Sequence, residues 1–247
     1  MQKINFSEDI RHSDKQSASV LSDDYEKGSQ LLADIGAVVS IFGSARFGRE
    51  NFYCERARNL AKMLADEGLH ITSGGSGGIM EAANEGAKAS TLAHSLGFNL
   101  RLPFEQKSNP FTTRAITLNS FSVRKRMLIK NAVACVAFPG GFGTLDEIFD
   151  TLALVQTRKV LPIKIYLYGE KFWRGLKDFM KTSLVDFGTI GAQDLNVLQI
   201  SDDLEYIVKS IKEHLEVYLE MMRSEGLEQS ERYALIKKQF ENFKKKG

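Results

Sequence analysis

Residues 132–147 read AVACVAFPGGFGTLDE, and this stretch decides the fold. Its first seven residues, Ala132–Phe138, form an unbroken apolar run, which predicts a strand buried on both faces of a parallel sheet. The glycines that follow predict a tight turn, and a helix is expected from about Leu145 to Gln156. A buried strand that runs through a turn into a helix is the repeating unit of a parallel α/β sheet.

The same unit recurs along most of the chain. Further strands are predicted at 37–42, 69–72, 93–100, 115–118, 163–168 and 197–200, and helices at 23–35, 51–67, 79–88, 123–131, 170–182 and 203–222. This alternation predicts a Rossmann-like, doubly wound parallel sheet flanked by helices, in a single domain. We expect the domain to span residues 23–222, after a flexible lead (1–22) and before a charged C-terminal helix (223–247).

Composition narrows the class of protein. Of 247 residues, 43% are hydrophobic and 26% are charged, as in globular proteins. The formal net charge is only +2, so binding of an anion requires a local site. No apolar run approaches the roughly 20 residues that span a bilayer, and residues 1–14 lack a signal-peptide pattern. We therefore expect a soluble cytoplasmic protein, in which Cys54 and Cys135 are buried free thiols.

Three glycine-bearing loops are predicted to follow strands: Gly43-Ser44, Gly74–Gly78 and Gly140–Thr144. Ligands of a doubly wound sheet bind outside the carboxyl ends of the strands, where such loops meet. Glycine lets the backbone approach a ligand closely, and the next helix offers unpaired N–H groups with a partial positive charge. One such loop is as often a plain turn, but three at one edge predict a phosphate site.

The glycine spacing limits the kind of nucleotide. The dinucleotide pattern G-x-G-x-x-G fails at Met80 and at Asp146, and no Gly-Lys pair is present for a triphosphate-binding loop. The four histidines have no metal-ligand spacing and are expected at the surface or in the core. We therefore expect a monophosphate site that uses no cofactor and no metal ion.

Two sets of charged residues near these loops are candidates for chemistry. Arg124-Lys125-Arg126 lies near the start of a predicted helix, where the helix dipole disfavours cations. It is either a surface patch or a ligand for an anionic substrate. Glu147 follows Thr144 by three residues, which is the spacing of a capping box. The same carboxylate would lie within reach of a ligand on the preceding glycines, so both roles can coexist.

The lysines of the C-terminal segment indicate a solvated helix face. Lys237-Lys238 and Lys244–Lys246 are interleaved with glutamates, which is not typical of a nucleic-acid site. We expect neither nucleic acid nor a membrane as a partner.

Four segments resemble the LOG (Lonely Guy) family. Residues 139–147 match its signature P-G-G-x-G-T-x-x-E in full. Residues 124–127 resemble its R-K-x-x-M element, with the methionine one position early, and residues 73–80 (SGGSGGIM) resemble its G-G-G-x-x-G-[LI]-M segment. Residues 43–46 (GSAR) look like the G-S-x-R opening of its longer members, and the order agrees from about residue 36 to residue 200.

The resemblance implies a homodimer, or an assembly of dimers, that hydrolyses the N-glycosidic bond of a nucleoside 5′-monophosphate. Members act on cytokinin riboside monophosphates, in cytokinin biosynthesis, or on AMP and other monophosphates. The resemblance assigns catalysis to Arg124 and Glu147. The residues expected to bind the substrate and its phosphate are Gly43, Ser44, Arg46, Gly74, Gly75, Gly78, Met80, Glu81, Lys125, Gly140, Gly141, Gly143 and Thr144.

Two alternatives stay open. Glu81 stands where many plant-like members have glycine, and it is either a second carboxylate near the ribose or a helix N-terminal acid without a catalytic role. The alternative function is a non-catalytic nucleotide-binding module of the same fold. Arg124 and Glu147 favour the hydrolase, because a pure binder needs the glycines but no carboxylate beside the sugar. An older label for such proteins, lysine decarboxylase, requires a Schiff-base lysine, for which no motif is present.

Overall fold

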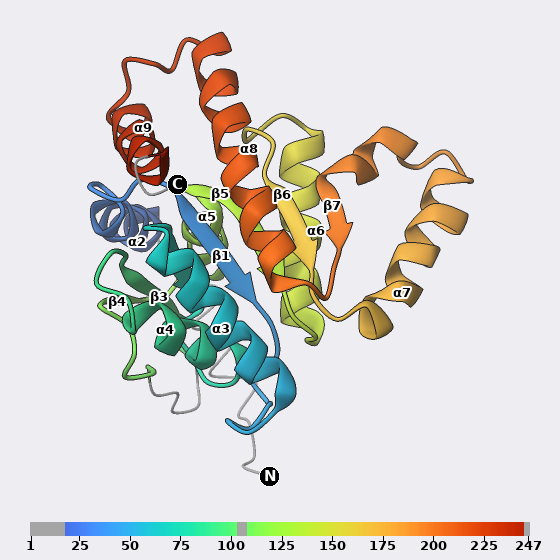
Figure 1. The fold of residues 1–247 in the computed structure, drawn as a ribbon, viewed down its shortest axis with the longest axis horizontal. Helices are drawn as coiled ribbons and strands as arrows, with labels where there is room; N and C mark the ends of the chain where they lie inside the picture. The colour runs from blue at the N-terminus through green and yellow to red at the C-terminus, as the bar shows by residue number, and fades with distance from the viewer. Residues whose placement is uncertain (1–17, 103–107, 245–247) are drawn as a thin grey trace.

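The computed structural model describes residues 18–102 and 108–244, and its centre is a seven-stranded sheet (Figure 1). The strand order is β4-β3-β2-β1-β5-β6-β7, and all neighbouring strands run parallel. The strands are β1 (Val38–Phe42), β2 (His70–Ser73), β3 (Ser95–Leu100), β4 (Arg114–Leu118), β5 (Ala132–Ala137), β6 (Lys164–Leu167) and β7 (Leu198–Ile200). The predicted Rossmann-like, doubly wound sheet is confirmed. The chain turns from one direction of winding to the other between β1 and β5, which places a ligand crevice there.

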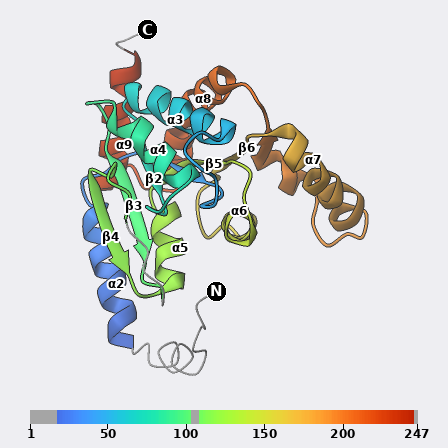
Figure 2. The same cartoon turned by 90° about the horizontal axis from the view of Figure 1, so that it is seen from below.

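Helices cover both faces of the sheet. They are α2 (Ala18–Leu31), α3 (Phe52–Asp66), α4 (Ile79–Lys88), α5 (Phe121–Ile129), α6 (Phe142–Gln156), α7 (Glu170–Phe179), α8 (Leu204–Ser224) and α9 (Glu231–Lys244), with a π-helical turn at Met180–Val185 and a 3-10 turn at Ala192–Val197. The view along the sheet shows α3, α4 and α8 on one side, and α2, α5 and α6 on the other (Figure 2). Among the described residues, no helix is both long and apolar enough to cross a bilayer.

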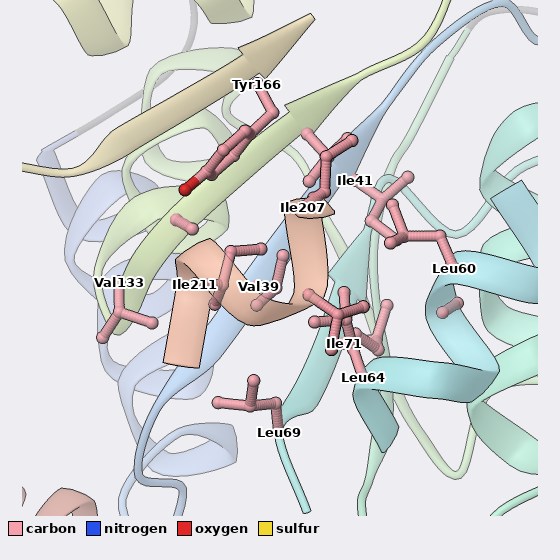
Figure 3. Packing of buried hydrophobic residues seen from close by; sticks show 14 of the residues in the cluster. Val39, Ile41, Leu60, Leu64, Leu69, Ile71, Val133, Tyr166, Ile207 and Ile211 are labelled. Atoms are coloured by element: carbon pink, nitrogen blue, oxygen red, sulfur yellow. The ribbon is translucent and has the colours of Figure 1, made fainter. Parts of the chain in front are cut away.

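The larger core lies between the sheet and the layer of α3 and α8 (Figure 3). Val39 and Ile41 of β1 meet Leu60 and Leu64 of α3, and these four side chains are fully buried. Leu60 and Leu64 stand four residues apart, so they lie on one face of their helix. A second core on the opposite face of the sheet contains buried residues of β1, β3, β4, β5, β6, α5, α6 and α7. Burial on both faces explains why the strands carry unbroken apolar runs.

Helix α2 begins earlier than the sequence predicts. Residues 18–22 were expected in a flexible lead, but they form the first turns of α2, and the rest of that lead lies outside the described residues. The buried Asp24 carboxylate explains why this part of the chain is a packed helix. It accepts hydrogen bonds from the backbone N–H groups of Asn119 and Ser120, each at 2.7 Å. These bonds join α2 to the turn between β4 and α5.

The predicted charged C-terminal helix is present as α9, and it packs on the main core through Tyr233, Ile236 and Phe243. Its polar side chain Gln239 accepts a hydrogen bond from Ala37 N at 2.5 Å and donates one to Gly68 O at 3.0 Å. Lys237 Nζ lies 4.0 Å from Glu241 Oε1 on the side of α9 that faces solvent. This agrees with the predicted solvated helix face. Lys245 and Lys246 lie outside the described residues.

Replacing Gln239 is expected to destabilise the fold. Gln239→Ala leaves the N–H group of Ala37, a fully buried residue, without an acceptor, which costs about 1–3 kcal/mol. Chemical denaturation of the variant and of Lys238→Ala, a neighbour on the exposed face, measures this cost. Equal stability of the two variants would show that the bond to Ala37 contributes nothing.

Candidate functional site

The three glycine loops meet at Ser44, directly after the central strand. Ser44 N donates to Pro139 O after β5, and Ile79 N at the start of α4 donates to Ser44 O, both at 3.0 Å. One residue therefore bonds to the loop after β5 and to the loop after β2. The expected meeting of Gly43-Ser44, Gly74–Gly78 and Gly140–Thr144 at one edge is observed.

Two glycines permit this close approach. Gly78 has φ +64°, and a side chain there would collide with the carbonyl oxygen of Ser44. A side chain on Gly140 would collide with the Thr144 side chain and would stand 3.1 Å from Ser44 N. Gly141 and Gly143 differ, since a Cβ at either would enter open space. Gly78 and Gly140 therefore allow the loops to meet at Ser44. Gly141 and Gly143 leave the surface next to this junction accessible.

Helix α6 offers unpaired N–H groups to this open space. The predicted start at Leu145 is wrong, because the helix begins at Phe142 with Gly141 as its N-cap. The first backbone bond runs from Leu145 N to Gly141 O, so the amides of Phe142, Gly143 and Thr144 precede it. Thr144 is thus the third helical residue and not a cap, and the expected capping box with Glu147 is absent. Three such amides at the positive end of a helix are typical of an anion site.

Arg124 reaches this edge from α5, whose N-cap is Ser120. Its Nε donates to Phe98 O on β3 at 2.8 Å, and its guanidinium lies against the backbone of Gly74. Only 13% of the side chain is exposed. Among the two interpretations of the basic cluster, the surface patch is therefore wrong for Arg124.

Glu147, one turn inside α6, faces Arg124. Their Oε1 and Nη1 atoms are 3.7 Å apart, and 15% of the Glu147 side chain is exposed. Burial raises the pKa of Glu147 to about 7, although the charge of Arg124 opposes this shift. Burial lowers the pKa of Arg124, and Glu147 opposes that shift. The site thus holds a carboxylate that changes charge near neutral pH beside a cation.

A buried network of small polar side chains fixes the loop after β2, and the sequence did not single it out. Asn84 of α4 accepts from Ser73 Oγ at 2.6 Å and from Asn109 Nδ2 at 2.9 Å, and it donates to Ser95 Oγ at 2.9 Å. Asn109 also donates through its backbone N to Gly75 O at 3.0 Å. The one available signal was two asparagines in apolar segments, at positions 84 and 99.

Asn99, at the end of β3, is a further residue that the sequence did not identify. A Cβ on Gly75, whose φ is +70°, would stand 2.6 Å from Asn99 Oδ1, so the two residues are in close contact. The Nδ2 group of Asn99 is buried and has no hydrogen-bond partner. A buried amide donor without an acceptor is costly, so this group is available to a ligand.

The remaining predicted residues lie around this centre. Met80 packs against Gly74 beside Arg124, and Arg46 is exposed while its backbone N donates to Ser44 Oγ at 3.1 Å. Lys125 Nζ lies 2.8 Å from Asp146 Oδ1, so it is directed to that carboxylate. Glu81 Oε1 lies 3.9 Å from Arg49 Nη1 and lines a small cavity with the loop after β1. No contact joins Glu81 to Arg124 or Glu147 within the described residues.

The histidines and cysteines that the structure describes lie outside the site. His70 and His94 stack 5.4 Å apart near α2, and burial lowers the pKa of His70 to about 4. The buried His214 lies 3.0 Å from Pro162 O, and His12 is outside the described residues. Cys54 and Cys135 are buried and free, as expected. No group of three or more potential metal ligands occurs in the part of the chain that the structure describes.

The chain matches a family model described as "Possible lysine decarboxylase" over residues 80–211, which is more than half of its length. A probable cytokinin riboside 5′-monophosphate phosphoribohydrolase of Oryza sativa subsp. japonica is 30% identical over 53% of this chain and 57% of its own. A bifunctional cytokinin biosynthesis protein of Fusarium pseudograminearum is 27% identical over 70% of this chain and 39% of its own. The chain thus spans less than two thirds of the length of these relatives.

Solved structures with the same fold include molybdenum cofactor proteins. The molybdenum cofactor binding protein of Rippkaea orientalis has a TM-score of 0.51 and 19% identity, over 72% of this chain and 96% of its own. The molybdenum cofactor carrier protein of Chlamydomonas reinhardtii has a TM-score of 0.52 and 21% identity, over 73% of this chain and 99% of its own. At such identities the likeness shows the fold alone.

The free energy of unfolding is expected to fall as the pH rises through 7, because of Glu147. Its pKa is about 7 in the folded protein against an ordinary 4.5, so the folded state holds the proton more tightly. This contribution to stability is complete below pH 4.5 and is lost as the pH rises through the folded pKa; it is on the order of 3 kcal/mol. Urea unfolding of the wild type and of Glu147→Gln at pH 5 and pH 8 measures it. A stability difference between the two proteins that is the same at both pH values contradicts the raised pKa.

Proposed function

The chain belongs to the LOG family, which the possible lysine decarboxylase model describes, and we propose that it is a phosphoribohydrolase. Its substrate would be a nucleoside 5′-monophosphate, such as a cytokinin riboside monophosphate or AMP, and its products the free base and ribose 5-phosphate. The observation that carries this proposal is the Arg124–Glu147 pair, 3.7 Å apart, beside the free amides of α6. An anion site next to a carboxylate that titrates near pH 7 suits glycoside hydrolysis better than simple binding.

The phosphate would bind at the amino end of α6. The amides of Phe142, Gly143 and Thr144 supply hydrogen bonds, and the open space above Gly141 and Gly143 admits a phosphoryl group. Binding energy from this group, which does not react, positions the attached ribose over Glu147. The unpartnered Asn99 Nδ2 is a donor for a hydroxyl group or the base of the same ligand.

Glu147 would act on the sugar and on the attacking water. The bond between C1′ and the base nitrogen breaks as positive charge develops on the ribose, and the ionised carboxylate stabilises that charge. Glu147 then accepts a proton from the water whose oxygen bonds to C1′. The departing base nitrogen takes up a proton from the solvent, and Glu147 returns its proton to the solvent, so the protons balance. Arg124, fixed by Phe98 O, would hold the phosphate or stabilise the departing base.

The residues do not fit the lysine decarboxylase name of the family model. Pyridoxal chemistry requires a lysine that is free to form a Schiff base. The lysine adjacent to the pair, Lys125, has its ammonium 2.8 Å from Asp146 and 3.9 Å from Asp150. An amine that is held by two carboxylates is not free to attack a carbonyl carbon. We therefore propose no decarboxylation.

Incubation of the protein with AMP, other monophosphates and a cytokinin riboside monophosphate, with detection of free base, tests the proposal. Glu147→Gln is expected to lower turnover about 10²–10⁴-fold, because it removes the general base. Glu213→Gln is the matched control and should retain turnover, since the Glu213 side chain is 66% exposed on α8, outside the candidate site. Tight binding of a monophosphate without release of base would instead identify a non-catalytic binding module.

The outer face of α6 supports the proposed homodimer. Phe142 and Phe149 lie two helical turns apart on this face and are 92% and 37% exposed, beside the partly buried Leu145 and Leu152, which pack against the second core. An apolar stripe of this kind is typical of an interface between subunits. Because α6 also carries Glu147, a second copy docked here would border the candidate site.

Disruption of this stripe is expected to give a monomer. Phe149→Glu places a charge in the apolar contact, which is costly when buried. Sedimentation analysis of this variant is compared with Val217→Glu on α8, where an apolar side chain that is 49% exposed lies on the opposite layer. A wild-type protein that sediments as a monomer would exclude the dimer.

A further inference from the structure

A cavity of about 670 Å³ lies at the opposite end of the sheet from the candidate site. It is lined by the end of α5, the segment 158–163 that follows α6, the last turns of α8, and Arg232 of α9; we call it the basic cavity. Ala132, the first residue of β5, lines it, whereas the candidate site follows the last residue of that strand. Val155, the residue of α6 that lines the cavity, lies eight residues after Glu147, which is about 12 Å along the helix. The two sites are therefore distinct.

The lining of the basic cavity carries an excess of positive charge. Five cationic side chains line it against one carboxylate, Glu225; they are Arg126, Lys130, Arg158, Lys159 and Arg232. Within residues 18–102 and 108–244, none of the five has a carboxylate within 4.0 Å. Lys130 donates to Ser29 Oγ at 2.6 Å, so its ammonium is turned toward α2. Four cations remain. The C-termini of α5 and α6 each supply roughly half a negative charge, so these two helix ends do not neutralise the four positive charges.

Arg158 stands in a backbone conformation that favours glycine. It follows α6 with φ +56°, and it is the one described residue other than glycine with a positive φ. Arg158 N bonds to Val155 O at 3.0 Å and Lys159 N to Leu154 O at 2.9 Å, which is the Schellman ending of a helix, where glycine is usual. An arginine kept at such a position despite the strain points to a role for its side chain.

Arg232, which also lines the basic cavity, has a hydrogen-bond donor without an acceptor. Its Nη2 donates to Tyr218 OH at 2.7 Å, and the guanidinium lies 5.6 Å from the centre of the Tyr218 ring. Its Nε is buried and has no hydrogen-bond partner. Because a buried guanidinium N–H without an acceptor is costly, this geometry favours a ligand that supplies an anionic oxygen.

The rest of the lining is apolar. Ile129, Val160, Leu161, Met221 and Leu227 contribute aliphatic side chains, and Tyr218 contributes an aromatic ring. The volume falls within the range of pockets that hold small organic ligands. From the four cations, the unsatisfied Arg232 donor and these walls, we propose that the basic cavity binds a nucleotide that carries two or more phosphates. Its phosphates would contact Arg126, Arg158, Lys159 and Arg232, and its base and sugar would cover the apolar wall.

Calorimetric titration of the full chain with ATP tests the proposal. Wild-type protein should bind ATP, and the affinity should fall with added salt, because several charges are paired. Arg158→Gly and Arg232→Gln should each weaken binding about tenfold or more, as expected for loss of a charge-assisted hydrogen bond. Lys181→Ala removes the same charge from an exposed site outside the cavity and should leave the affinity unchanged. Inorganic tripolyphosphate should bind more weakly than ATP, and equal affinities would overturn the assignment of a nucleoside.

Two further measurements separate this proposal from misfolding and from binding at the candidate site. Glycine suits the conformation at position 158, so Arg158→Gly should melt at or above the wild-type temperature. Gly141→Val, which fills the open space at the start of α6, should leave ATP binding intact and block AMP. If Gly141→Val abolishes ATP binding, or if Arg158→Gly binds ATP as the wild type does, the basic cavity is not the ATP site.

Discussion

The backbone of Ser44 joins the parts of this molecule that matter for chemistry. Its N–H group bonds to Pro139 O and its carbonyl accepts from Ile79 N, so the loops that follow β1, β2 and β5 are held together by main-chain groups. No side chain can be placed at Gly78 or Gly140 without a collision at this junction. The amino ends of α4 and α6 are therefore brought to one point by the sheet itself. A ligand there meets a surface whose shape does not depend on flexible side chains.

Around this rigid junction the protein places a charge pair in a nearly dry environment. Arg124 is fixed from the side by Phe98 O, and Glu147 is fixed by its position on α6. Burial of both groups raises the pKa of the carboxyl and lowers that of the guanidinium, and the charge of each group opposes the shift of the other. The network through Asn84 holds the remaining loop and leaves Asn99 with an unused donor. Rigid surroundings for a group that titrates near neutral pH are typical of catalytic sites.

The sheet and most helices could be predicted from the sequence, because strands that are buried on both faces have unbroken apolar sequences. The start of α6 could not, since Gly141-Phe142-Gly143 has poor helix propensity and is helical only because the β5 strand and the junction direct it. The motif spacing indicated Arg124 and Glu147, but not that Lys125 would turn to Asp146 or that Glu81 would pair with Arg49. These orientations depend on partners 21 and 32 positions away. Asn84 and Asn109 meet across 25 positions, and no local pattern signals such a contact.

The hydrogen bond of Gln239 can form only late in the synthesis of residues 37–239. The hydrogen bond between Gln239 and Ala37 joins residues 202 positions apart in the chain. Ala37 leaves the ribosome before Gln239, so its N–H group has this partner only after the residues between them have been translated. At typical synthesis rates of roughly 5–20 residues per second, that interval lasts about 10–40 s. During this interval the amino edge of the central strand lacks α9, so the nascent chain exposes to chaperones and proteases a region that the finished protein covers.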